Sequence, residues 1–106
     1  MIPEVTPAAL AAELKGECPP KLLDVREAEE LQISRLPVDY HIPMGELPFR
    51  LAELDRSENL VVVCRSGARS GQVTAFLLAQ GFEHVRNLTT GLNGWSRSVD
   101  PSMRQY

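Results

Sequence analysis

The most constraining feature of the sequence is a run of apolar, mostly β-branched residues that stops at a cysteine. Leu60-Val61-Val62-Val63 has no polar alternation and leads directly into Cys64. Such a run is typical of a strand buried on both faces, as in a parallel sheet covered by helices. The next residues, Arg65 to Ala68, include a glycine and precede an apolar pattern at helical spacing. The sequence therefore predicts strand, loop and helix in succession, with Cys64 at the carboxyl end of the strand.

The rest of the chain alternates between strand-like and helix-like segments. Thr6 is suited to cap a helix that ends before Gly16. Further helical segments are expected at 27–33, 47–54, 73–80 and 91–97, and strands at 22–25, 40–42, 60–63 and 84–88. This alternation predicts an α/β layer fold with a mainly parallel sheet.

Length and charge limit the possible classes of protein. The 106 residues suffice for one hydrophobic core, and no linker-like stretch divides them, so one domain spanning 1–106 is expected. A net charge of -3 without a basic stripe argues against a nucleic-acid partner. The longest apolar run is far below the roughly 20 residues of a membrane-spanning helix. With no signal-like pattern after Met1, a cytoplasmic location without a membrane partner is expected.

The two cysteines are expected to be free thiols. A chain in a reducing compartment does not keep a disulfide between Cys18 and Cys64. These cysteines and the two histidines, His41 and His84, are not spaced as zinc ligands. No metal and no other cofactor is therefore predicted.

The surroundings of Cys64 indicate an activated thiol. The segment from Asn59 to Phe82 has no Asp or Glu but contains Arg65 and Arg69. Backbone N–H groups at the start of the following helix can converge on an anion. Both features are expected to lower the pKa of the Cys64 thiol from about 8.5 to roughly 3.5–7.5, which makes it a nucleophile at neutral pH. The candidate site consists of Cys64, Arg65, Ser66, Gly67, Ala68, Arg69 and Ser70.

Three blocks of the sequence resemble the signature blocks of rhodanese domains, in the same order. They are Asp24-Val25-Arg26-Glu27, the run from Val61 to Ser70, and Leu88-Thr89-Thr90-Gly91-Leu92-Asn93-Gly94-Trp95. The resemblance implies a three-layer fold with a five-stranded, mainly parallel sheet and helices on both faces. It also implies a thiosulfate sulfurtransferase that carries sulfur as a persulfide on Cys64 and passes it to a thiophilic acceptor. In that family the loop amides line the pocket, Arg65 and Arg69 attract a small anionic sulfur donor, and Asp24 and Arg26 pack beneath the loop.

A second resemblance narrows the subfamily. Leu36-Pro37, the segment Ile42 to Pro48, and the ending Val99-Asp100-Pro101 with Tyr106 resemble the rhodanese domain fused to E1-like adenylyltransferases. This resemblance implies a ubiquitin-like sulfur carrier as a protein partner and sulfur trafficking for cofactor or tRNA thiolation. Residues 34–39 depart from the pattern of many rhodanese relatives.

Several alternatives stay open at this point. One alternative is a cysteine-dependent phosphatase or arsenate reductase on the same fold. Cys64 and Arg69 are separated by four residues, whereas the related cysteine phosphatases place five between the cysteine and the arginine and so form a wider loop. The chain could also be a binding module that keeps the fold without catalysis, or Cys64 an inert core cysteine. Asp24 and Arg26 could equally form an ordinary ion pair at a strand end.

Overall fold

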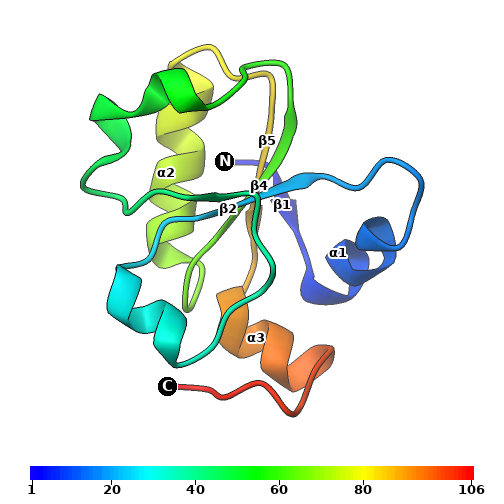
Figure 1. The fold of residues 1–106 in the computed structure, drawn as a ribbon. Helices are drawn as coiled ribbons and strands as arrows, with labels where there is room; N and C mark the ends of the chain where they lie inside the picture. Colours follow the sequence, from blue (N-terminus) through cyan, green and yellow to red (C-terminus); the bar gives the residue numbers. More distant parts are fainter.

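The centre of the molecule is a five-stranded sheet in which every neighbouring pair of strands is parallel. The computed structural model describes all residues, 1–106. The strand order is β1-β5-β4-β2-β3, which leaves β4 in the middle (Figure 1). The strands are β1 (Glu4–Val5), β2 (Lys21–Asp24), β3 (Tyr40–His41), β4 (Asn59–Val63) and β5 (His84–Leu88). The predicted mainly parallel five-stranded sheet is confirmed.

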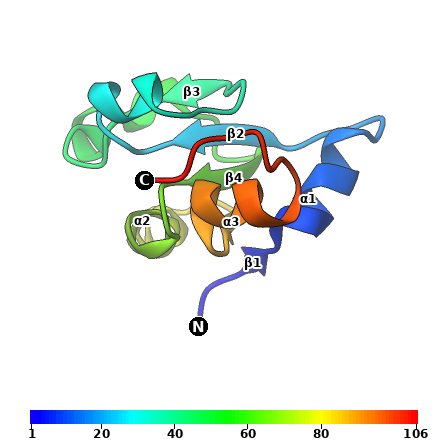
Figure 2. The same ribbon diagram turned by 90° about the horizontal axis from the view of Figure 1, so that it is seen from below.

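Helices cover both faces of this sheet and create three layers. Helix α2 (Ala68–Ala79) lies on one face, while α1 (Pro7–Leu14) and α3 (Gly91–Ser98) lie together on the other (Figures 1 and 2). Alternate residues of β4 enter opposite cores: Leu60 and Val62 pack with the α2 side, Val61 and Val63 with the α1 and α3 side. The apolar run therefore lacks polar alternation because both of its faces are buried, as the sequence predicted.

Local sequence signals explain most element boundaries. The Thr6 hydroxyl oxygen caps α1 by accepting a hydrogen bond from the backbone N–H of Ala9 at 3.2 Å. Gly81 has a positive φ of 90° just after the end of α2, a conformation that glycine adopts without steric cost. The helical segment predicted at 27–33 is a 3-10 helix, η1 (Ala28–Gln32).

Two features differ from the sequence-based predictions. The helix expected over 47–54 is instead two three-residue 3-10 turns, η2 (Leu47–Phe49) and η3 (Leu51–Glu53), because Arg50 between them has a non-helical backbone. The leucine spacing reflects a loop anchored on the core rather than an amphipathic helix. Strand β1 was not predicted, since two residues carry no periodicity and β1 exists only through its pairing with β5. No helix has both the length and the apolar character needed to cross a membrane.

Candidate active site

Cys64 lies where the three sequence blocks meet. It follows the central strand β4, whose neighbours β2 and β5 end at the same edge of the sheet because all three strands are parallel. The chain then turns through Gly67, which has a positive φ of 98°, into the N-terminus of α2. The sequence predicted that Gly67 permits a tight turn, and its left-handed backbone agrees with this prediction.

The sulfur of Cys64 lies within hydrogen-bonding distance of two backbone N–H groups and one hydroxyl. The backbone N–H groups of Gly67 and Ser70 donate to Sγ over 3.1 and 3.4 Å, and the hydroxyl oxygen of Ser70 lies 3.2 Å from it. The residue is only 1% exposed, so the sulfur lies beneath the loop rather than on the surface. The loop thus forms a close cradle for an anion on sulfur.

These contacts decide the acidity of the thiol. Burial raises the pKa of Cys64, but hydrogen bonds from the Ser70 hydroxyl and from the N–H groups of Ser70, Gly67 and Ser66 lower it, and the net pKa lies below the ordinary value. The direction agrees with the sequence-based prediction. The hydrogen bonds of the loop, led by Ser70, cause the lowering.

Helix α3 holds the loop in the conformation that turns its amides inward. The N–H groups of Leu92 and Asn93 donate to the carbonyls of Cys64 and Arg65 over 2.9 and 3.0 Å. This contact needs Gly91, which has a φ of 59° and whose added Cβ would lie 2.4 Å from the Arg65 carbonyl oxygen. The third sequence block, from Leu88 to Trp95, therefore holds the cysteine loop in place through hydrogen bonds to its backbone carbonyls.

Replacing Gly91 with alanine is expected to lower the free energy of unfolding by about 2–4 kcal/mol. Alanine is strained in the left-handed backbone at this position, and its Cβ would overlap the Arg65 carbonyl. Gly45→Ala is the matched control, because nothing lies within 4 Å of its added Cβ, and it should change stability by less than about 0.5 kcal/mol. Urea denaturation of both variants measures the difference. Equal stabilities would contradict the proposed close approach of α3.

The two arginines of the loop have different electrostatic surroundings. Both terminal nitrogens of Arg69 donate to the carboxylate of Glu30, each over 2.7 Å. This bidentate contact is the main cause that lowers the pKa of Glu30 to about 2. Arg65 has no carboxylate partner, and its guanidinium lies 5.0 Å from the centre of the Tyr106 ring. The positive charge of Arg69 is therefore balanced within the protein, whereas that of Arg65 is not.

Tyr106 joins this ion pair to the predicted supporting residues. Its hydroxyl donates to Glu30 over 2.7 Å and accepts from Arg26 over 3.0 Å. Its backbone carbonyl also accepts from the side chain of Asn93. Glu30 was not predicted, and Tyr106 was singled out only as part of a resemblance and not as a site residue, because nothing local connects residues 76 positions apart.

Asp24 and Arg26 form a completely buried ion pair. Both side chains are 0% exposed, and Nη2 of Arg26 lies 2.9 Å from Oδ2 of Asp24. Arg26 also donates to the carbonyls of Glu30 and Ser34. The pair reaches the cysteine loop indirectly, through Tyr106, Glu30 and Arg69. The supporting role of Asp24 and Arg26 stays a prediction: hydrogen bonds connect the pair to the loop, but neither side chain contacts the sulfur.

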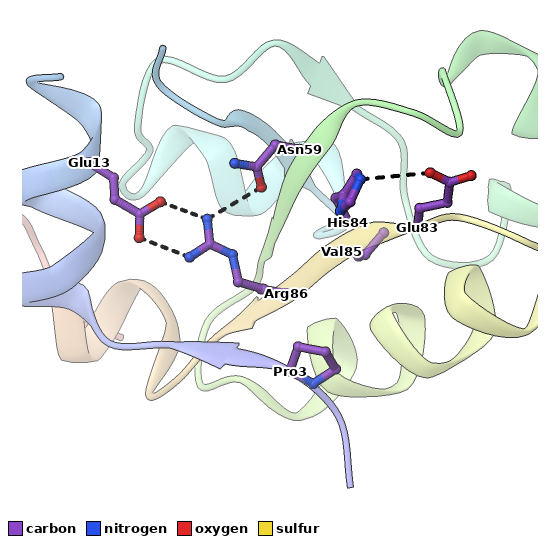
Figure 3. A pocket seen from close by; sticks show the side chains of 7 residues that line it. All are labelled: Pro3, Glu13, Asn59, Glu83, His84, Val85 and Arg86. Carbon is purple, nitrogen blue, oxygen red and sulfur yellow. Dashed lines mark hydrogen bonds and ion pairs between the residues drawn. The ribbon is translucent and has the colours of Figure 1, made fainter. Parts of the chain in front are cut away.

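The largest surface concavity, about 580 Å³, lies far from Cys64. Figure 3 shows its lining around the starts of β4 and β5. Cys64 follows the other end of β4, so the two sites lie at opposite ends of the sheet. The guanidinium of Arg86 there is already bound by the Glu13 carboxylate and by Asn59. None of the three concavities of the surface is lined by Cys64. The cysteine site is consequently a narrow cradle rather than an open pocket.

The fold and this cradle define an α/β protein with a hydrogen-bonded cysteine, of lowered pKa, at the carboxyl end of its central strand. The chain belongs to the rhodanese-like domain family, whose model matches residues 6–98.

Comparisons with individual proteins agree with this family. The chain is 34% identical over 97 residues to a sulfurtransferase of Allochromatium vinosum, covering 92% of this chain and 91% of that protein. It is 35% identical over 95 residues to the maize (Zea mays) adenylyltransferase and sulfurtransferase MOCS3-1, covering 83% of this chain but 20% of that protein. The crystal structure of a rhodanese-like domain protein from Staphylococcus aureus superposes with a TM-score of 0.84 at 27% identity, over 99% of both chains.

Proposed function

We propose that the chain is a sulfurtransferase that carries a sulfur atom as a persulfide on Cys64. The observation that supports this proposal best is the alignment of the Gly67 and Ser70 N–H groups with the sulfur at the end of β4. These donors suit a sulfur that alternates between thiolate and persulfide anion, because either charge develops within the same cradle. The sulfurtransferase names among the relatives support sulfur transfer as the general activity.

The transfer takes place in two displacement steps. The thiolate of Cys64 attacks the outer sulfur of a donor such as thiosulfate, the sulfur–sulfur bond of the donor breaks, and sulfite leaves with the electron pair. The terminal sulfur of the Cys64 persulfide is then attacked by a thiophilic acceptor. The new bond of the acceptor to sulfur forms as the Cys64 thiolate is released.

The sulfur of Cys64 is closed off from solvent in this structure. Because Cys64 is 1% exposed, a donor reaches it only after side chains around the loop move apart. Arg65, the loop arginine without a carboxylate partner, attracts an anionic donor such as thiosulfate or a persulfide. A ubiquitin-like sulfur carrier is the proposed protein partner. A relative from Bacillus subtilis is named a putative sulfur carrier protein, and the name of the maize relative combines an adenylyltransferase with a sulfurtransferase. Sulfur trafficking for cofactor or tRNA thiolation is the corresponding role.

Mass spectrometry of the protein after treatment with thiosulfate tests the proposal. One added sulfur atom is expected on the peptide that contains Cys64 and none on the peptide that contains Cys18, which is an exposed free thiol. Cyanide should then remove the added sulfur and yield thiocyanate. An unmodified Cys64 peptide, together with phosphate release from an aryl phosphate, would favour a phosphatase instead.

A further inference from the structure

A buried chain of hydrogen bonds links the sulfur of Cys64 to β5. The Ser70 hydroxyl lies between Sγ of Cys64, at 3.2 Å, and the side-chain oxygen of Asn87, to which it donates a hydrogen bond. The amide nitrogen of Asn87 donates to the Gly67 carbonyl over 3.2 Å. Ser70 is 0% exposed and Asn87 4%, so water does not compete for these groups.

The direction of the hydrogen bonds follows from the Gly67 carbonyl. A carbonyl oxygen can only accept, so it faces the NH₂ group of Asn87 and turns the side-chain oxygen toward Ser70. That oxygen can also only accept, and the hydroxyl proton of Ser70 therefore points at Asn87. While the thiol is neutral, a lone pair of the hydroxyl therefore faces Cys64 and accepts from the thiol. The lowering of the Cys64 pKa by Ser70 belongs to the ionised state, in which the hydroxyl turns its proton toward the sulfur.

Ionisation of the Cys64 thiol reverses the direction of the hydrogen bond that the sulfur needs from the Ser70 hydroxyl. A thiolate accepts hydrogen bonds only, so the hydroxyl must either turn its proton toward the sulfur and leave Asn87 or present a lone pair to an anion. Both outcomes cost free energy in a buried site. Asn87 and the thiolate thus compete for one proton.

We propose that Asn87 is a positioning residue that limits how strongly Ser70 stabilises the thiolate of Cys64, and thereby keeps the sulfur reactive. The inference rests on the proposed function, in which this sulfur is the nucleophile. A thiolate that is stabilised too strongly attacks slowly, because nucleophilicity falls as thiol acidity rises. Asn87 offsets part of the stabilisation that the loop amides supply.

The Glu30–Arg69 ion pair and Tyr106 beside the loop do not titrate in the pH range of this competition. Arg69 keeps its charge because its pKa is raised, Glu30 has a pKa of about 2, and burial raises the pKa of Tyr106. None of these three groups changes charge near neutral pH. Other charged or titratable groups at this end of the sheet include Arg65 of the loop, the buried Asp24–Arg26 pair at the end of β2, and His41 of β3, whose ring nitrogen contacts the Arg26 carbonyl.

A double-mutant cycle in the Cys18→Ser background tests the proposal. The ultraviolet absorbance of the thiolate, followed against pH, reports the pKa of Cys64 without requiring a reagent to reach it. Asn87→Leu should lower this pKa by about 0.5–1 unit, since Ser70 becomes free to donate to the anion. Ser70→Ala should raise it by roughly one unit. In the Ser70→Ala background, Asn87→Leu should have no further effect.

The reactivity of the thiolate provides an independent readout. At a pH where Cys64 is fully ionised, alkylation of Asn87→Leu by iodoacetamide should be about two- to threefold slower than that of the parent. At low pH it should be faster, because more thiolate is present. The two pH–rate profiles are therefore expected to cross.

A purely structural role for Asn87 predicts a different pattern. Asn87→Leu would then shift the pKa equally with and without the Ser70 hydroxyl, and this result would overturn the proposal. Asn87→Ala, which also removes the acceptor, serves as a second variant if leucine prevents folding, as judged by circular dichroism. The Gly67 carbonyl keeps its hydrogen bond from Gly71 N–H at 3.0 Å in either variant. Neither readout depends on sulfur transfer, so failure here and failure to load sulfur from thiosulfate remain distinguishable.

Discussion

Replacement of Cys64 with serine is expected to reduce sulfur transfer by at least about a thousandfold. The hydroxyl of serine cannot form a persulfide, and its proton is not lost at neutral pH, whereas the pKa of the Cys64 thiol is lowered by the Ser70 and Gly67 hydrogen bonds. Thiocyanate formation from thiosulfate and cyanide measures the loss. The same variant should gain no sulfur mass in the presence of thiosulfate.

Cys18→Ser is the control for this experiment, because Cys18 is an exposed thiol outside the loop. It should transfer sulfur at the rate of the unmodified protein. Unchanged transfer by Cys64→Ser would remove the basis of the proposed mechanism. Retention of a cellular role by Cys64→Ser, without transfer, would instead indicate a binding module.

Replacement of Arg26 with methionine is expected to lower the free energy of unfolding by about 3–5 kcal/mol. The variant leaves the carboxylate of Asp24 buried without its charged partner, and both side chains are 0% exposed in the native protein. It also removes the donor to the carbonyls of Glu30 and Ser34 and to the Tyr106 hydroxyl. Urea denaturation monitored by circular dichroism measures the effect.

Two further variants distinguish the stability lost through the unpaired charge of Asp24 from the stability lost through missing packing contacts. Lys21→Met breaks the exposed pair with Asp39, in which the charged atoms are 3.8 Å apart, and should cost less than about 1 kcal/mol. The double variant Asp24→Leu/Arg26→Met removes both buried charges and should recover much of the stability lost in Arg26→Met. If the double variant is as unstable as the single one, the uncompensated charge of Asp24 is not the cause.

Much of the fold and of the site could be predicted from local patterns in the sequence. The apolar run of β4 indicated a strand buried on both faces, and Gly67 indicated the tight turn after Cys64. The lowered pKa of Cys64 was predicted from the helix N-terminus and from the charges of Arg65 and Arg69, and its direction agrees, with hydrogen bonds from Ser70, Gly67 and Ser66 as the cause. These features follow from residues that are neighbours in the chain, so propensity and periodicity are sufficient to predict them.

Only the tertiary structure decided how the loop is charged and supported. Glu30 neutralises Arg69 across 39 positions, although the segment around Cys64 contains no acidic residue of its own. Tyr106 meets Glu30 across 76 positions, and Asn87 of β5 meets Ser70 of α2. Sequence periodicity reports which face of an element is buried, but not which distant polar group it meets there. That pairing is set by the order of the strands and by the need of each buried polar group for a partner.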